Sequence, residues 1–145
     1  MGEGYRYLDD VAIADIAFQA WGSDLDRLFY QAARATAEIM VDDLGTVRRE
    51  VRRSVDLAAR DPEMALFDLL QELVYYKDAE SLILVPESVT VTEGPDEVRV
   101  QADLVGEPFD PARHPLNADV KAVTLHRFSV RRTGDAWGAE VVLDI

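Results

Sequence analysis

The chain of 145 residues has the length of one domain, and its apolar fraction of 48% is sufficient for a buried core. It carries 28 acidic and 15 basic residues, a formal net charge of −13, which argues against strong direct binding to nucleic acid or to an anionic membrane surface. It contains no cysteine, so disulfides, thiolate metal sites and a cysteine nucleophile are excluded. The polar start and the lack of a long apolar run predict a cytoplasmic protein.

The first third of the chain predicts a strand followed by a helix. Residues 16–21 alternate between two faces, which is typical of a strand, and Gly22 closes it. Ser23 stands three residues before Asp26, a spacing that predicts a helix N-cap. Apolar residues then recur at intervals of three and four as far as Met40. We expect this helix to end in the turn at residues 42–45.

The next segments predict a strand and a second helix. Residues 47–57 fit both helical and strand spacing, and their β-branched content favours a strand. Asp61 is followed by proline and glutamate, which predicts a capped helix start. A leucine-rich stripe over residues 66–74 continues that helix, and Lys77 falls on the same stripe.

From residue 81 onward the hydrophobic period changes to two, which predicts strands. We expect a short strand that Pro86 stops, a hairpin around residues 94–96, a long irregular segment over residues 106–117, and a last hairpin around residues 133–135. The sequence therefore predicts a single α+β domain over residues 1–145, with two helices packed on a largely antiparallel β-sheet.

Two groups of acids could hold a hard divalent cation through oxygen ligands. Asp9, Asp10 and Asp15 precede or enter the first predicted strand, and such acids otherwise remain solvated or cap turns. Asp144 lies beside the α-carboxylate of Ile145, and two such anions repel each other unless a cation is near. The alternative for this second group is a frayed chain end.

Three further side chains are candidates for binding a partner or ligand. Lys121 alternates with Val123 and Leu125 on one face of a predicted strand, so it is either paired with an acid or functional. His126 has apolar neighbours and is expected to be a hydrogen-bonded core histidine. His114 lies in the proline-rich segment, where we expect it to be more exposed and freer to contact a ligand.

Motifs of common enzyme classes do not occur in the sequence. It contains no phosphate-binding glycine loop, no G-x-S-x-G elbow and no H-E-x-x-H pair. Its single basic run comprises Arg48, Arg49, Arg52 and Arg53. This run could contact phosphate, but its alternation favours a solvated strand face whose arginines pair with nearby acids.

Motifs spread along the whole chain resemble the archease family, accessory proteins of the RtcB-type tRNA-splicing RNA ligase. They are Tyr5-Arg-Tyr-Leu-Asp9, Ala14-Asp15-Ile16, Ala20-Trp21-Gly22, Asp68-Leu-Leu-Gln-Glu-Leu73, Gly106-Glu107, His114, Asp119-Val-Lys-Ala-Val-Thr-Leu-His126 and the terminal Val-Leu-Asp144-Ile145. The family's versions of the last two read close to EVKAVTYH and VxxDI/L. No single motif is decisive, whereas the ordered set is specific.

The resemblance implies an α+β protein that is not itself an enzyme. It implies activation of a GTP-dependent ligase in tRNA splicing and RNA repair, by promoting ligase guanylylation and multiple turnover. It also implies a divalent-cation site, with Ca²⁺ expected and Mg²⁺ or Mn²⁺ as alternatives. By position, Asp15, Asp144 and the Ile145 carboxylate match the metal ligands, and Lys121 matches a lysine needed for activation.

The first motif departs from the family pattern. The family has a His-Thr pair before the acid, whereas this chain lacks that pair and has a longer segment there. Asp15 keeps its place before the strand and is the preferred ligand, with Asp10 or Asp9 as the alternative. Two other functions stay open: a metal-binding chaperone or modulator of another RNA-processing enzyme, such as a tRNA methyltransferase, and a small hydrolase using Asp15, Asp144 and a metal-bound water.

Overall fold

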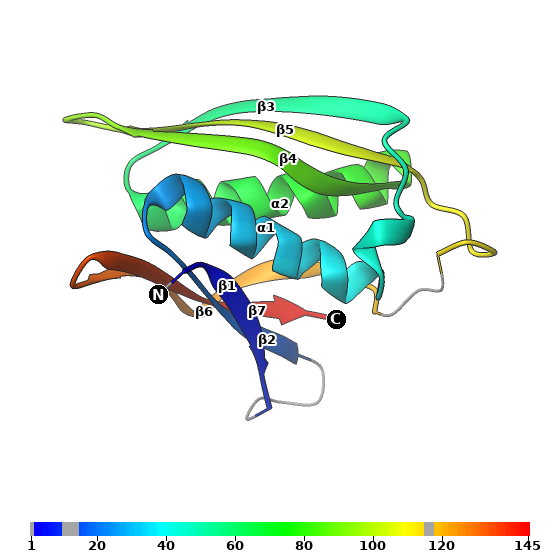
Figure 1. The fold of residues 1–145 in the computed structure, drawn as a ribbon, viewed down its shortest axis with the longest axis horizontal. Helices are drawn as coiled ribbons and strands as arrows, with labels where there is room; N and C mark the ends of the chain where they lie inside the picture. Colours follow the sequence, from blue (N-terminus) through cyan, green and yellow to red (C-terminus); the bar gives the residue numbers. More distant parts are fainter. Residues whose placement is uncertain (1, 10–14, 115–117) are drawn as a thin grey trace.

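Two helices lie between two antiparallel sheets in the computed structural model, which describes residues 2–9, 15–114 and 118–145 (Figure 1). The helices are α1 (Leu25–Met40) and α2 (Pro62–Glu80), and a short 3₁₀ turn, η1, covers Leu44–Thr46. One sheet has the order β1 (Gly4–Leu8), β2 (Asp15–Gly22), β7 (Ala136–Asp144), β6 (Ala122–Thr133). The other has the order β3 (Val51–Ala59), β5 (Val98–Pro108), β4 (Leu82–Glu93).

This arrangement confirms the predicted α+β class with two helices and antiparallel pairing. It adds that the strands form two sheets, so each helix packs against a sheet on both sides. Phe18 of β2 and Phe29 of α1 are fully buried, as are Ile83 and Leu104 in the opposite sheet. The apolar core therefore fills both spaces between the layers.

The helix starts follow the predicted chemistry, with one shift. Asp61 caps α2 by accepting the backbone N–H of Met64 at 2.9 Å, as expected. The predicted cap of α1, Ser23, is wrong by one residue, because Asp24 accepts the N–H of Arg27 at 2.8 Å. The helix then begins at Leu25, and the aspartate provides the capping oxygen.

The expectation that Pro86 stops a strand is also wrong. β4 continues through Pro86 to Glu93, with a register shift between Pro86 and Ser88. Proline is tolerated there because β4 is an edge strand and the proline lies at an irregularity in the ladder. The two predicted hairpins are confirmed: Glu93 pairs with Val98, and Thr133 pairs with Ala136.

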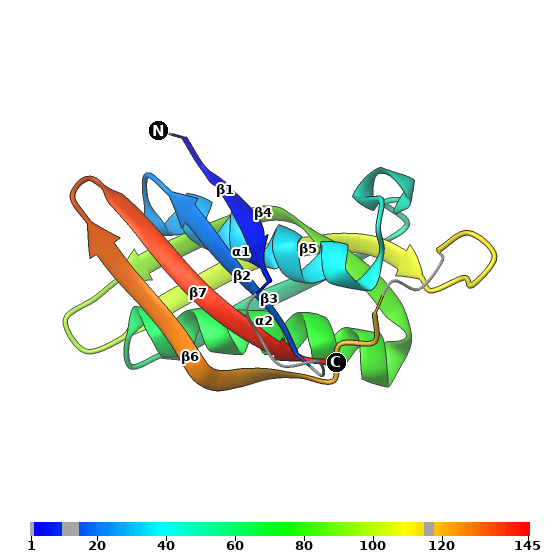
Figure 2. The same cartoon turned by 90° about the horizontal axis from the view of Figure 1, so that it is seen from below.

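Helix side chains cover outward-facing N–H groups of two edge strands. The N–H of Val123 in β6 donates to Gln71 of α2 at 3.1 Å, and that of Val130 donates to Glu63 at 3.1 Å. In the other sheet, the N–H of Val91 donates to Asp26 of α1 at 2.8 Å. Figure 2 shows β6 running along the outer side of its sheet. These bonds make both edges poor templates for added strands.

None of the helices in the described ranges is long and apolar enough to cross a membrane.

Candidate functional site

The structure brings Asp15, Asp144 and Lys121 together at one end of the four-stranded sheet. Asp15 of β2 is the register partner of Asp144 in β7. Directly opposed residues of antiparallel strands have Cα atoms about 4.5–5.5 Å apart, so the two carboxylates are neighbours on one face. The backbone N–H of Lys121 donates to the carbonyl oxygen of Asp144 at 2.8 Å.

The chain end at this site is held in place. Asp144 pairs with Asp15 on one side and with Ala122 on the other, since β7 lies between β2 and β6. Ile145 is half-buried and packs against the core. These contacts contradict a frayed terminus, because the last residues are paired and packed.

The two lysines of the chain have different surroundings. Lys121 lies just before β6 and not within a strand as predicted, and its side chain is exposed. Lys77 is largely buried, and its Nζ donates to Asp119 and to Asp78, both at 2.6 Å. Burial would lower the pKa of Lys77, but these two carboxylates raise it above its ordinary value. Lys77 thus anchors the segment that carries Lys121.

The donors at this end are oxygens, the ligand type that Ca²⁺, Mg²⁺ and Mn²⁺ prefer. Within residues 2–9, 15–114 and 118–145, Asp15 and Asp144 form no ion pair. The same residues contain no cluster of three or more histidine, cysteine, aspartate or glutamate side chains suited to a metal. Asp9 is exposed, and Asp10 lies outside the described residues. The two aspartates and the Ile145 α-carboxylate match a hard cation in the type of donor atom. In number they are three groups, whereas Ca²⁺ takes about 6–8 oxygen ligands.

A pocket of about 380 Å³ opens beside Asp15, between β1, β2 and the end of α1. Its lining combines apolar and acidic side chains: Tyr7, Leu8, Asp15, Ile16, Glu38, Ile39 and Asp42. The Tyr7 hydroxyl lies 2.8 Å from Ala35 O and 3.1 Å from a carboxylate oxygen of Glu38, and these two acceptors share its one proton. Burial and then the charge of Glu38 raise the pKa of Tyr7, so this hydroxyl stays protonated. The surroundings of Asp15 are therefore acidic and partly apolar.

Glu107 and His114 form a buried contact that the spacing of residues in the sequence did not predict. Glu107 is 3% exposed, and its carboxylate accepts the Arg48 N–H at 2.7 Å and a charged hydrogen bond from Arg113. His114 is fully buried, and its Nδ1 accepts the Asp110 N–H at 2.9 Å. Its Nε2 therefore carries the proton and donates to Glu107 at 3.0 Å. Burial would raise the pKa of Glu107, but these donors lower it to about 2.

The environments of the two histidines are the reverse of those expected. His114, expected to be exposed, is buried because Glu107 and the turn after β5 surround it. His126, expected in the core, is exposed because the β6–β7 register is interrupted between Thr124 and Ser129. Local apolar spacing indicated a regular strand there and gave no signal of this irregularity.

The fold thus defines a small α+β protein of two helices between antiparallel sheets, with an acidic, well-held chain end. The family model of the Archease protein family matches residues 5–145, and the chain belongs to the archease family. It is similar to protein archease of Methanosarcina acetivorans, 35% identical over 99% of this chain and 97% of the relative. It is 38% identical to protein archease of Archaeoglobus fulgidus, over 97% of this chain and 98% of the relative.

Solved structures agree with this fold. The solution structure of Methanobacterium thermoautotrophicum protein 1598 superposes with a TM-score of 0.83 at 29% identity, covering 98% of this chain and 99% of the other. A crystal structure from Thermotoga maritima, described as an archease and possible chaperone, has a TM-score of 0.58 at 18% identity, covering 97% and 98% of the two chains. At that identity the second likeness shows the fold alone.

Proposed function

We propose that this protein is a non-catalytic activator of a GTP-dependent, RtcB-type RNA ligase in tRNA splicing and RNA repair. It would promote guanylylation of the ligase and its multiple turnover in the cytoplasm. Membership of the archease family over residues 5–145 supports the proposal. The observation that carries it is that Asp15, Asp144 and Lys121, which are distant in sequence, lie at one end of one sheet.

The roles proposed for these residues follow from their chemistry. Asp15, Asp144 and the Ile145 α-carboxylate would hold a divalent cation, with Ca²⁺ favoured over Mg²⁺ or Mn²⁺. Such a cation would supply positive charge at an end of the sheet that otherwise carries adjacent anions. Lys121 is exposed beside Asp144, so its ammonium is able to reach a phosphate or an acid on the ligase.

A chaperone or modulator of another RNA-processing enzyme, such as a tRNA methyltransferase, is the second candidate. The family that matches residues 5–145 includes the Thermotoga maritima protein in its description, and that protein is described as a possible chaperone, which favours this candidate. The two candidates differ in the partner, because only the first requires an effect on ligase guanylylation. A metal-dependent hydrolase differs from both, since it would act without any partner.

A ligation assay with the matching ligase at limiting concentration tests the proposal. Adding this protein should raise both the number of turnovers and the amount of guanylylated ligase. Unchanged values of both would refute ligase activation. Phosphoester turnover by the protein alone would instead support the hydrolase.

Lys121→Ala should abolish activation and leave the Tm nearly unchanged, because the side chain is exposed. The control is Arg99→Ala, which removes an exposed cation from the opposite sheet. A large fall in Tm for Lys121→Ala would assign Lys121 a structural role. Equal activation by both variants would remove Lys121 from the proposal.

Asp144→Asn, and separately deletion of Ile145, should weaken Ca²⁺ binding measured by calorimetry, because each removes a negatively charged oxygen donor. Asp135→Asn, at the exposed tip of the last hairpin, is the matched control. Unaltered Ca²⁺ binding in both test variants would exclude the chain end from the site.

A further inference from the structure

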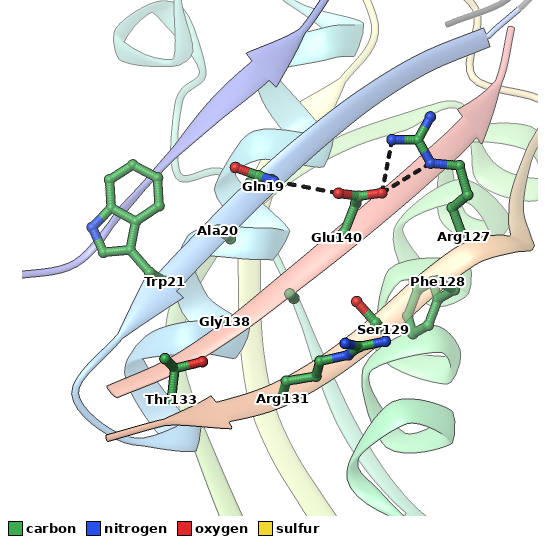
Figure 3. Close-up of a pocket in the computed structure, with 11 residues that line it drawn as sticks. Gln19, Ala20, Trp21, Arg127, Phe128, Ser129, Arg131, Thr133, Gly138 and Glu140 are labelled. Atoms are coloured by element: carbon green, nitrogen blue, oxygen red, sulfur yellow. Dashed lines mark hydrogen bonds and ion pairs between the residues drawn. The ribbon is translucent and has the colours of Figure 1, made fainter. Parts of the chain in front are cut away.

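A second hollow lies on the outer face of the four-stranded sheet, away from the helices (Figure 3). It has a volume of about 610 Å³, within the range of small-ligand sites. Residues of β2, β6 and β7 line it: Gln19, Ala20, Trp21, Arg127, Phe128, Ser129, Arg131, Thr133, Gly138, Ala139 and Glu140. Gln19 lies four residues along β2 from Asp15, or about 13 Å at roughly 3.3 Å per residue, so this pocket is separate from the acidic chain end.

Gly138 lies in the lining of the hollow and contributes no side chain to it. Gly138 of β7 pairs with Trp21 on one side and with Arg131 on the other. Among the described residues, a Cβ at Gly138 would meet only Ala20 O, at 3.8 Å, so the backbone does not require glycine there. The glycine leaves a gap beside Arg131, whereas the ring of Trp21 is turned away from Gly138 and toward β1 (Figure 3). Trp21 rests against Gly4 of β1 and remains 37% exposed.

An unusual backbone conformation turns a second arginine toward this face. The irregularity between Thr124 and Ser129 contains Arg127, whose φ of 57° is in the left-handed region. A non-glycine residue in that region costs about 1–3 kcal/mol, and such strain is concentrated at functional sites. Arg127 bonds Glu140 at 3.0 Å, whereas Phe128 packs edge-to-face with Phe67 of α2. The irregularity therefore sends the arginine outward and the phenylalanine inward.

The charge of this pocket differs from that of the molecule. In and just before β3 of the other sheet, Arg49 and Arg52 pair with Glu87, and Arg53 pairs with Glu80. In the described parts of the chain, Arg131 has no carboxylate within ion-pair distance. The lining holds two arginines and one acid, in a chain of net charge −13. A free guanidinium and an excess of positive charge suit an anionic ligand.

We propose that this pocket binds a nucleoside phosphate, free or as one nucleotide of single-stranded RNA. Arg131, with the hydroxyls of Ser129 and Thr133, provides donors for the phosphate, since guanidinium groups match phosphate geometry. The partly exposed ring of Trp21, which lies over β1 at the edge of the pocket, offers an apolar surface against which a base stacks. The net charge of the protein keeps the affinity low. This binding is independent of the cation and of Lys121.

The test uses the two indole N–H signals in a ¹H–¹⁵N spectrum, since the chain contains only Trp21 and Trp137. Trp137→Phe assigns them. The full-length protein is titrated at constant ionic strength with AMP, adenosine, inorganic phosphate, hexa-adenylate and a glutamate hexapeptide. AMP should shift the Trp21 signal and leave that of Trp137 in place, with smaller effects from adenosine or phosphate alone. Tighter binding of hexa-adenylate than of AMP identifies RNA as the source, and equal affinity identifies the free nucleotide.

Two variants locate the binding. Arg131→Gln should weaken AMP binding about tenfold, the effect of losing one charge-assisted hydrogen bond. Gly138→Val should also weaken AMP binding, because valine fills the gap and has a high propensity for β-strands. Arg99→Gln, on the opposite sheet, is the control and should bind as the wild type does. Equal Tm values establish that each variant is folded. If Gly138→Val is unstable, Arg131→Gln still tests the proposal, because the side chain of Arg131 is exposed.

Three results would overturn the proposal. The first is no shift of the Trp21 signal at about 10 mM AMP or hexa-adenylate, where a Kd of about 1 mM would give near saturation. The second is wild-type affinity in Arg131→Gln. The third is an equal or larger response to the glutamate hexapeptide, which would identify the pocket as a site for acidic protein segments.

Discussion

Replacing Glu107 with glutamine removes one charge from a buried contact that joins three segments of the chain. The carboxylate of Glu107, at the end of β5, accepts hydrogen bonds from the Arg48 N–H, from Arg113 and from His114. A glutamine has one acceptor oxygen, and its NH₂ group would face a donor. Glu107→Gln should therefore loosen both the segment after η1 and the turn that holds His114.

The magnitude follows from the pKa of Glu107, which is about 2 in the folded protein against an ordinary 4.5. The unfolded chain binds this proton more readily, so the stabilisation is fully present above pH 4.5 and is lost as the pH falls toward 2. At about 1.36 kcal/mol per pH unit, the difference corresponds to about 3.4 kcal/mol. Solvent screens Arg113, which is 31% exposed, so we expect about 2 kcal/mol.

Urea unfolding followed by circular dichroism measures this difference. At a pH of about 7, Glu107→Gln should lower the free energy of unfolding by about 2 kcal/mol, and at a pH of about 3 by about 1 kcal/mol. Glu97→Gln is the control, because its partner Arg99 lies 3.6 Å away and both side chains are about half exposed. The same loss at both pH values, or a loss no larger than that of the control, would refute the role of the Glu107 charge.

Two further changes test the packing beside the candidate site and between β4 and β5 of the other sheet. Lys77→Met should lower the Tm and remove a loss of stability at alkaline pH. The pKa of Lys77 is raised in the folded state, so the stabilisation by its charge is present below about pH 10.5 and is lost above it. Wild-type stability that does not fall in alkaline urea titrations would contradict this. Gly106→Ala should prevent normal folding, because a Cβ there would lie 1.8 Å from Ile83 O. A circular dichroism melt like that of the wild type would contradict this and would show that β4 and β5 separate easily.

Features set by neighbours in the chain were predicted well. The Asp61 cap, both hairpins and the strand that leads to Gly22 depend on residues within a few positions of one another. The strand favoured over residues 47–57 is confirmed as β3, shifted to Val51–Ala59. The resemblance to archease is confirmed by the family model. It could be recognised from the sequence because the motifs that carry it are themselves local segments.

Features set by contacts between distant segments were predicted poorly. His114 is buried because it donates to Glu107, and His126 is exposed because the pairing of β6 with β7 is interrupted beside it. Pro86 continues a strand because β4 lies at a sheet edge. The conformation of Arg127 has no counterpart in local residue spacing. Each of these outcomes depends on which strand lies next to which.

The sequence by itself determined the α+β class, the family and the list of candidate residues, because periodicity, caps, turns and motifs are properties of short segments. Only the tertiary structure decided that Asp15 faces Asp144 beside Lys121, and that Gly138 lies in register between Trp21 and Arg131 in the lining of a pocket. The physical reason is strand register, because backbone hydrogen bonds between β2, β7 and β6 align residues more than a hundred positions apart. The net charge of −13 likewise does not specify how charges are distributed over the two faces of that sheet.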